Sequence, residues 1–343
     1  MILDELAIPI VQAPMAGGPS TPALAAAVSE AGGLGFVAAG YKTPDAMAED
    51  IAATRAATRK PFGVNVFAAR PTDAPPGALD AYAERVSIDT APAGEPRADD
   101  DAFAEKVERL IADPPAVVSF VFGCPDPELI GRLKEAGSEV WLTVTDADEV
   151  RAAAAAGADA LIAQGVEAGG HRGSFDDEHP GDLGLLALLQ VASAATDLPL
   201  VASGGIATGR AVAAVLAAGA SAAQVGTALM RAPEAATSAV HREALARPGR
   251  TALTRAFTGR TARGIVNRFL VEHDDAAPAA YPAVHFITAP IRKHGREAGD
   301  PDLVNLWAGQ AHELGGEAPA GEIVAALWRD ARAAAAALHD RTG

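Results

Sequence analysis

The segment 164–173, Gln-Gly-Val-Glu-Ala-Gly-Gly-His-Arg-Gly, has the residue types of a site for a flat ligand. His171 directly follows Gly169 and Gly170, and Gly173 comes two positions later. Because glycines carry no side chain, a flat ligand can approach this segment closely. An imidazole held there can accept a proton near pH 7 or, when protonated, stabilise a developing anion. His171 is therefore a candidate catalytic residue, with a surface histidine of no role as the alternative.

Two further glycine-containing segments have the character of a phosphate site. Gly204 and Gly205 precede a helix expected from Thr208, and Gly226-Thr227 follows a short apolar run. Glycines let backbone N–H groups approach an anion, and the N-terminus of a helix adds a favourable dipole. Tight turning between a strand and a helix is the alternative reason for these glycines.

Short β-branched runs alternate with alanine-rich helical stretches along the chain, and this alternation predicts how these residues are positioned. The strand-like runs are 9–15, 34–39, 62–67, 117–122, 139–144, 160–164, 199–203 and 223–226. Eight successive units predict an α/β fold, a (β/α)₈ TIM barrel, and a doubly wound open sheet is the alternative. Active sites of such barrels lie at the C-terminal ends of the strands, so the glycine-rich segments fall on one face.

Two segments interrupt this rhythm. Residues 68–100 are rich in proline and acidic residues, and we expect a long loop with one short helix. Residues 236–299 contain no clean strand–helix unit and are too long for a plain barrel connection. We therefore expect residues 1–235 and 300–343 to form the barrel. Residues 236–299 are expected to form an accessory lid or substrate-side segment after strand eight. The C-terminal part predicts one helix from about 301 to 314 and another over 322–338.

Composition limits the classes of partner. The 343 residues include 28 Lys and Arg against 44 Asp and Glu, a formal net charge of −16, which argues against nucleic acid or an anionic membrane as partner. The first residues lack the basic segment of a secretory signal, and no apolar run of about 18 residues is free of polar interruption. The single cysteine excludes an intramolecular disulfide and a cysteine-rich metal site. We expect a cytoplasmic enzyme without a metal.

Six segments, in barrel order, resemble the nitronate monooxygenase family, formerly called 2-nitropropane dioxygenases. They are QAPMAGGPS (12–20), PFGVNVF (61–67), AQGVEAGGHRG (163–173), LPLVASGGI (198–206), AQVGTALM (223–230) and LWAGQ (306–310). They spread over nearly the whole chain, and the EAGGH segment among them is specific. The resemblance implies an FMN-dependent barrel that oxidises alkyl nitronates, or nitroalkanes, with O₂ to a carbonyl compound and nitrite.

The resemblance also implies roles for individual residues. His171 would be catalytic, Gln164 and Asn65 would contact FMN, and the glycine pair with residues 224–227 would hold the FMN phosphate. The full set of FMN-binding residues that we expect is Ala13, Pro14, Met15, Asn65, Gln164, Gly169, Gly170, Ser203, Gly204, Gly205, Gln224, Val225, Gly226 and Thr227.

Two other functions stay open. A flavin-dependent enoyl-ACP reductase shares the fold and a similar EAGGH segment, and would use NAD(P)H. A flavin-binding barrel without turnover, acting as a sensor or partner subunit, is the other. One departure from the family is Phe120-Val121-Phe122 in strand four, where members often carry a polar residue or histidine. A second imidazole from that strand is therefore not expected. The sequence leaves the oligomeric state and the particular nitronate open.

The remaining candidates are weaker. Cys124 is expected to be a small buried residue beside the flavin, Glu167 to hold its loop through backbone N–H groups, and Trp307 to pack within a helix. The other histidines show no metal-ligand spacing and are expected on the surface or hydrogen-bonded, with His312 the best candidate to approach the site. They are His179, His241, His273, His285, His294, His312 and His339.

Overall fold

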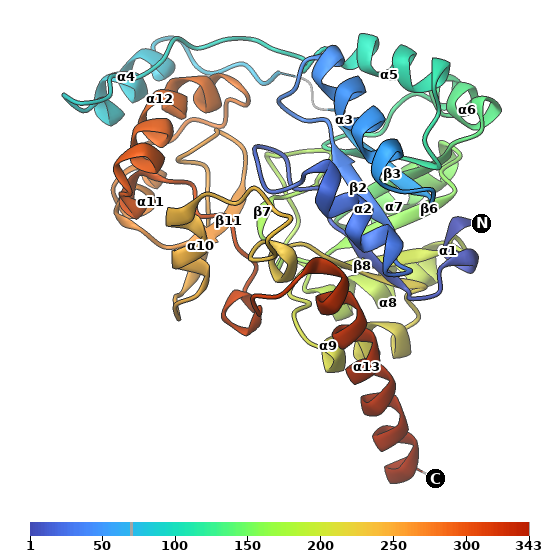
Figure 1. The fold of residues 1–343 in the computed structure, drawn as a ribbon. Coiled ribbons are helices and arrows are strands. Elements are labelled where there is room, and N and C mark those ends of the chain that lie inside the picture. The colour runs from blue at the N-terminus through green and yellow to red at the C-terminus, as the bar shows by residue number, and fades with distance from the viewer. Residues whose placement is uncertain (69–70, 343) are drawn as a thin grey trace.

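The computed structural model describes residues 1–68 and 71–342, and its centre is a nearly closed barrel of parallel strands (Figure 1). The strand order around the barrel is β1-β9-β8-β6-β5-β4-β3-β2. Backbone hydrogen bonds between the Gln12 N–H and the Leu34 carbonyl, and between the Leu34 N–H and the Ile10 carbonyl, bring the two edges together. The predicted (β/α)₈ barrel is therefore confirmed. Its strands are β1 (Ile10–Gln12), β2 (Gly35–Ala38), β3 (Phe62–Phe67), β4 (Val117–Val121), β5 (Glu139–Val144), β6 (Ala160–Gln164), β8 (Leu200–Ser203) and β9 (Ala222–Val225).

The outer helices begin at residues that can cap them. The Thr21 and Thr208 hydroxyls accept hydrogen bonds from backbone N–H groups three residues ahead, at Leu24 and Ala211, and Pro22 occupies the first helical position. At the C-terminal end of the helix Pro127–Ala136, Gly137 takes the left-handed conformation with a φ of 109°. The helices around the barrel are α2 (Pro22–Glu30), α3 (Pro44–Ala57), α5 (Phe103–Ala112), α6 (Pro127–Ala136), α7 (Ala147–Ala155), α8 (Leu185–Ala195), α9 (Gly209–Ala217) and α13 (Ala320–Thr342).

The N-terminal end of the barrel interior is filled with side chains. Phe36 and Trp141 belong to this inner cluster and are fully buried, with their ring centroids 6.0 Å apart. The short helix α1 (Ile2–Glu5) adds Leu3 to the same cluster, and the Ile2 N–H donates to Glu139 Oε1 at 2.7 Å. Because this end is closed, a ligand can enter the barrel only at the opposite, C-terminal ends of the strands.

A second group of elements lies beside the C-terminal ends of the strands, on the left of Figure 1. Its three-stranded antiparallel sheet has the order β10-β11-β7. The short strand β7 carries His171, so this sheet is joined to the loop after β6. A separate apolar core holds these elements together and includes Tyr82, Phe257, Phe269 and Ile287. The elements are α4 (Ala78–Val86), β7 (Gly170–His171), α10 (Ala239–Leu245), β10 (Thr251–Thr254), β11 (Ala262–Ile265), α11 (Arg268–His273) and α12 (Ala283–Ala298).

Outside the barrel, the predictions are partly confirmed. The single short helix expected in 68–100 is α4. The helix expected over 301–314 is wrong, because backbone groups of this segment pair with β11 and its flank instead of with one another. The Leu306 carbonyl accepts from the Ile265 N–H, and the Ala308 N–H donates to the Arg263 carbonyl. Only two short 3₁₀ turns form there, at Pro301–Leu303 and His312–Leu314.

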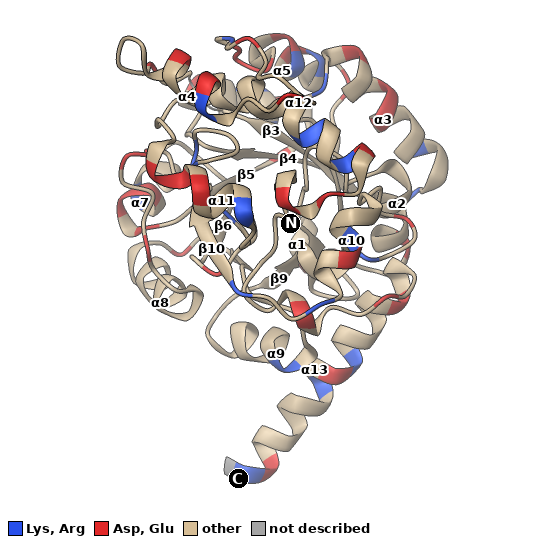
Figure 2. Ribbon diagram, turned by 90° about the vertical axis from the view of Figure 1, so that its left-hand side faces the viewer, with Lys and Arg blue, Asp and Glu red and all other residues tan. Residues whose placement is uncertain are grey.

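The acidic residues are spread over the outer helices (Figure 2). Among the described residues, no helix has the length and apolar character needed to cross a membrane. The long C-terminal helix α13 packs on α9 and α2 and then extends away from the barrel (Figure 1).

Candidate active site

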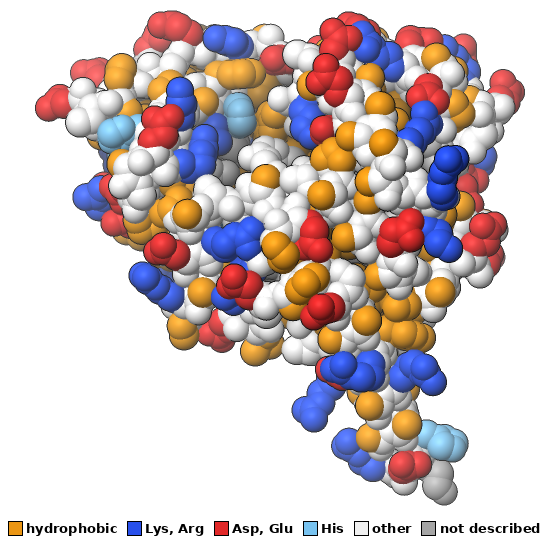
Figure 3. All heavy atoms as spheres, viewed as in Figure 1, with side chains coloured by type: hydrophobic (Ala, Val, Ile, Leu, Met, Phe, Trp, Pro, Cys, Tyr) orange, Lys and Arg blue, Asp and Glu red, His pale blue; other side chains and the backbone are white. Residues whose placement is uncertain are grey.

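A cavity of about 540 Å³ opens at the C-terminal ends of the barrel strands, bounded on its other side by the accessory elements. The space-filling view shows the surface hollowed between these two parts, with basic and histidine side chains near the hollow (Figure 3). This volume lies in the range of roughly 300–1,000 Å³ that is typical of ligand pockets. The predicted site residues that line it are Ala13, Pro14, Met15, Asn65, Gln164, Gly169, Gly170, His171, Ser203, Gly204, Gly205, Gln224, Gly226 and Thr227.

Val225 is the predicted residue that does not line the cavity. Its side chain is 1% exposed and belongs to the core between the barrel and the helices. Successive residues of a strand point to opposite faces, so Gln224 faces the cavity side and Val225 does not.

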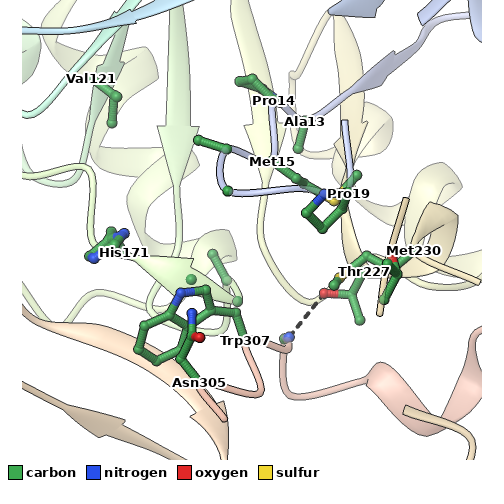
Figure 4. Close-up of a pocket in the computed structure, with 18 of the residues that line it drawn as sticks. Ala13, Pro14, Met15, Pro19, Val121, His171, Thr227, Met230, Asn305 and Trp307 are labelled. Carbon is green, nitrogen blue, oxygen red and sulfur yellow. Dashed lines mark hydrogen bonds between the residues drawn. The ribbon is translucent and has the colours of Figure 1, made fainter. Parts of the chain in front are cut away.

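Glycines allow three loops to meet closely at this end of the barrel. A Cβ atom on Gly169 would lie 2.4 Å from the Gly309 backbone nitrogen, and one on Gly204 would lie 3.1 Å from the Ala168 nitrogen. Gly204 and Gly205 have φ angles of 119° and 67°, which side chains disfavour. The Gly309 N–H also donates to Thr227 Oγ1 at 3.0 Å, the bond drawn in Figure 4. The segment around Gly309 thus closes against both predicted glycine loops.

The loop that carries His171 is held by side chains beneath it. Gln164 Oε1 accepts from the Gly173 N–H at 2.8 Å and from Arg172 Nη1 at 3.0 Å, and Gln164 Nε2 donates to the His171 carbonyl at 3.1 Å. Arg172 is fully buried. The Glu167 carboxylate accepts from the Leu185 N–H at the start of α8, so its predicted loop-holding role is confirmed. Both ends of the Gln164 amide therefore hydrogen-bond to the loop and hold its shape.

His171 stands among aromatic side chains. Its ring centroid lies 5.6 Å from that of Phe122, 5.8 Å from that of Tyr281 and 5.6 Å from that of Trp307. Nε2 lies 2.9 Å from Thr258 Oγ1. Figure 4 shows His171 and Trp307 on one side of the cavity, and Thr227 and Met230 on the other. The tryptophan predicted to pack within a helix is instead part of the cavity wall.

The surroundings of His171 favour its neutral form. Burial, followed by the positive charges of Arg260 and Arg292, lowers the pKa of His171 to about 3. The sequence suggested an imidazole that exchanges a proton near pH 7. In the structure the lowered pKa favours the neutral ring at pH 7, which is the form that can accept a proton, and disfavours the protonated form that would stabilise an anion.

Sequence reasoning missed the residues that α12 brings to the cavity. His285, Arg292 and Arg296 all line it, at a spacing that places them on one helix face. The His285 ring stacks on Tyr41 at 4.2 Å, and its carbonyl accepts from Arg292 Nη2 at 2.8 Å. A periodicity test of 283–298 for polar residues would have found this face.

Phe122 and Tyr41 are also unexpected members of the wall. Their φ angles are 76° and 64°, a conformation that bulky residues rarely adopt. The Arg260 guanidinium lies over the Phe122 ring at 4.2 Å from the centroid. The residue directly after β4 thus contributes an aromatic ring to the wall. Cys124 does not line the cavity, and burial raises the pKa of its thiol.

Among the described lining residues, the charged side chains are both cations, Arg292 and Arg296, and none is a carboxylate. Three lining side chains also have a buried polar atom without a hydrogen-bond partner within the described part of the chain. These atoms are Gln224 Nε2, Thr237 Oγ1 and His312 Nδ1. Buried polar groups are normally paired, so these three atoms mark a polar part of the wall, and the two arginines make the cavity cationic.

A barrel with a glycine-bounded, cationic cavity at the C-terminal ends of its strands has the architecture of a cofactor-dependent enzyme. Comparison with known proteins defines the family. The family model described as nitronate monooxygenase matches residues 2–330. A nitronate monooxygenase of Pseudomonas aeruginosa is 41% identical over 341 residues, which cover 94% of this chain and 96% of that one. A second, from Paraburkholderia phytofirmans, is 40% identical over 94% of this chain and 92% of its own length.

Solved structures agree with this result. The crystal structure of a nitroalkane oxidase from Streptomyces ansochromogenes matches with a TM-score of 0.95 and 51% identity, over 98% of this chain and 99% of that one. FabK from Thermotoga maritima matches with a TM-score of 0.79 and 28% identity, over 99% and 97% of the two chains. The chain belongs to the nitronate monooxygenase family, and it is a flavin-dependent oxidoreductase.

Proposed function

We propose that this protein oxidises alkyl nitronates with O₂ to a carbonyl compound and nitrite, with FMN as its cofactor. A nitronate is the anion of a nitroalkane. The observation that carries the proposal is the cavity wall around His171, which offers two arginines and no carboxylate among its described residues. A small anion is therefore favoured there although the chain as a whole is acidic.

The residues present fit FMN. Gly204, Gly205, Gly226 and Thr227 offer backbone N–H groups where glycine permits close approach, which suits one phosphate group. Gln224 Nε2 is a buried donor without a partner within the described residues, and it lines the same wall. When bound, FMN would accept electrons from the substrate and return them to O₂.

The amide oxygen of Asn65 is available to accept a hydrogen bond from the cofactor. Its Nδ2 donates to the Ser119 carbonyl at 3.2 Å and to Ser119 Oγ at 3.0 Å. The Asn65 oxygen is thereby left as an acceptor toward the cavity, where it suits the N–H of a flavin ring.

The cofactor assignment has a direct test. We expect the protein to purify yellow and to release FMN on heating, identified by chromatography against FMN and FAD standards. Release of FAD, or failure to bind FMN on reconstitution, would refute it.

His171 is assigned two tasks. Its neutral ring can accept the Cα proton of a nitroalkane, and its polar edge can orient the nitronate group. Replacing His171 with Ala should lower turnover of neutral nitroalkanes by about 10²- to 10⁴-fold, the usual contribution of a positioned base. The loss with a preformed nitronate should be smaller, because the proton is already gone. Oxygen consumption with both substrate forms measures the difference, and a variant with full rates on both refutes the assignment.

Residues 236–299 are proposed to form the substrate-side segment, which α4 and β7 join, beside a barrel formed by the rest of 1–235 and 300–343. Support comes from Arg292 and His285, which this segment places in the cavity wall. Substitutions there should change KM across nitronates of graded chain length while FMN retention stays intact. Loss of FMN with unchanged substrate preference would contradict this division.

The structural likeness to FabK supports a second candidate, an enoyl-ACP reductase that uses NAD(P)H. Anaerobic addition of NADH separates the two. Fast bleaching of the flavin favours the reductase, and unchanged absorbance followed by O₂ uptake with a nitronate favours our proposal. Flavin retention without turnover of either substrate would indicate a non-catalytic flavin-binding protein.

A further inference from the structure

We propose that Thr258 is a positioning residue that fixes the tautomer of His171, with the proton on Nε2 and the lone pair on Nδ1 facing the cavity. The inference rests on the proposed role of His171 as a proton acceptor. It concerns which ring nitrogen does that work and what sets the choice.

The Thr258 hydroxyl has three polar neighbours. His171 Nε2 lies 2.9 Å from Oγ1, the Arg260 carbonyl oxygen lies 3.2 Å away, and the Arg260 N–H approaches at an N–O distance of 3.4 Å. Thr258 is 1% exposed and Arg260 is 4% exposed, so bulk water does not compete for these groups. The Thr258 hydroxyl must therefore form its hydrogen bonds with these three groups and not with water.

Proton counting then selects one arrangement. A threonine hydroxyl has one proton to donate and can accept two hydrogen bonds. If it donates to His171 Nε2, the buried Arg260 carbonyl is left without a donor among the described side chains. If it donates to that carbonyl, the Thr258 oxygen accepts from Nε2–H and every group is satisfied. Buried backbone carbonyls are almost always paired, which favours the second arrangement.

The other ring nitrogen is then the functional one. His171 lines the cavity, and its Nδ1 has no hydrogen-bond partner within residues 1–68 and 71–342. The Nδ1 atoms of His273 and His312 are buried and have no partner within the described residues, whereas His171 Nδ1 is not buried. Nδ1 therefore opens onto the cavity. In the Nε2–H tautomer it offers a lone pair to a substrate C–H, whereas the opposite tautomer would offer a second donor and no base.

The fold holds Thr258 in place from both sides. His171 pairs with Ala262 in the β7–β11 ladder, which fixes the ring against the turn before β11. Gly259 has a φ of 77°, and a Cβ there would lie 2.6 Å from the Ala280 carbonyl oxygen, so this turn approaches the 278–282 segment at close range. The charged groups facing the ring from neighbouring elements are Arg260 and Arg292, and both disfavour a second proton on it.

Substitutions at Thr258 test the kinetic consequence. Thr258→Val keeps the shape and removes the hydroxyl. We expect kcat with a neutral nitroalkane to fall by about 10-fold or more, still short of the loss from removing the base itself. The rate with the preformed nitronate should fall less, and FMN should be retained. Thr258→Ser restores the hydroxyl and should restore most of the rate.

Thr261, in the same turn, provides a matched control. The Thr261 hydroxyl is buried and makes no hydrogen bond within the described residues, and this residue does not line the cavity. Thr261→Val removes a hydroxyl from the same turn and should leave both rates unchanged. Should Thr258→Val fold poorly, the tautomer of His171 in the wild type still decides the question, because a proton on Nδ1 there would overturn the proposal.

A direct readout of the tautomer keeps this inference separable from the proposed reaction. Nitrogen-15 spectra of the FMN-loaded protein with labelled histidine, assigned by comparison with His171→Ala, report which ring nitrogen carries the proton. We expect Nε2 in the wild type and Thr258→Ser, and a mixture or the opposite form in Thr258→Val. A proton on Nδ1 in the wild type, or the same tautomer and nitroalkane rate in Thr258→Val, would overturn the proposal. If His171→Ala keeps full activity, the proposed base role fails while the spectra still report on the tautomer.

Discussion

Three histidines should make the free energy of unfolding fall as the pH drops below about 7. Burial is the first cause in each case, and it lowers the pKa of His171 to about 3, of His241 to about 4 and of His285 to about 2. In the unfolded chain each ring titrates near 6.5. Below that pH the unfolded state binds protons that the folded state excludes, so the stability is full above pH 6.5 and is lost as the pH falls.

The size of the effect follows from linkage. Between pH 7.5 and 5.5, one such histidine lowers the free energy of unfolding by about 1.4 kcal/mol, and three lower it by about 4 kcal/mol. All three histidines line the cavity, and water there reduces the cost of protonating them, which makes this figure an upper limit. The buried carboxyls of Asp101 and Glu149 oppose the trend at the acid end, because burial raises their pKa values.

His241 provides the decisive variant. Its Nε2 lies 2.9 Å from the Trp307 carbonyl oxygen, and an asparagine amide can donate to the same oxygen. His241→Asn should reduce the loss between pH 7.5 and 5.5 by about 1.4 kcal/mol. Urea unfolding in excess FMN, followed by circular dichroism, measures it. His179→Asn on an exposed loop is the control, and it should not reduce the loss, because Asp176 raises the pKa of His179. Equal pH dependence in the wild type and His241→Asn would refute the reasoning.

Other predictions concern packing and paired groups. Gly169→Ala should destabilise by about 1–3 kcal/mol and weaken FMN retention, because its Cβ would lie 2.4 Å from the Gly309 nitrogen; thermal melting and flavin release measure both effects. Lys106→Met should lower the free energy of unfolding by about 3 kcal/mol, measured by urea unfolding, because the Asp101 carboxylate loses the buried ammonium group that lies 2.6 Å from it. Asn267→Ala should cost about 2 kcal/mol, because its amide donates to the carbonyls at 301 and 304 and its oxygen caps α11; an unchanged melting temperature would contradict this.

The part of the site that the sequence predicts correctly is the part set by the barrel. A strand and its following loop are local in sequence, and barrel closure brings every such loop to one end. The sequence therefore places Gly204 and Gly226 at a shared site from their positions after β-branched runs, and the family resemblance adds Asn65. Val225 is assigned to the site wrongly, because the prediction takes the whole segment 224–227. Successive residues of a strand point to opposite faces, so only some residues of such a segment can face the cavity.

The part that sequence reasoning missed comes from segments whose position depends on distant contacts. The two-residue strand β7 is too short to show any periodicity, yet its pairing with β11 brings Thr258 to His171. Trp307 lies in a segment that looks helical by composition, but its backbone groups pair with β11. The backbone conformation that turns Phe122 and Tyr41 into the wall has no local signature in either residue type.

The charge of the whole chain and the charge of the cavity have opposite signs, and this contrast bears on what can bind. The acidic exterior disfavours large polyanions, which must lie against many surface charges at once. Salt screens those surface charges beyond about 8 Å at physiological ionic strength. A small anion inside the cavity is then influenced mainly by Arg292 and Arg296, which the lower dielectric screens less. The acidic exterior would thus repel a large polyanion while the cavity attracts a small anion such as the nitronate that we propose, because size decides which set of charges a ligand meets.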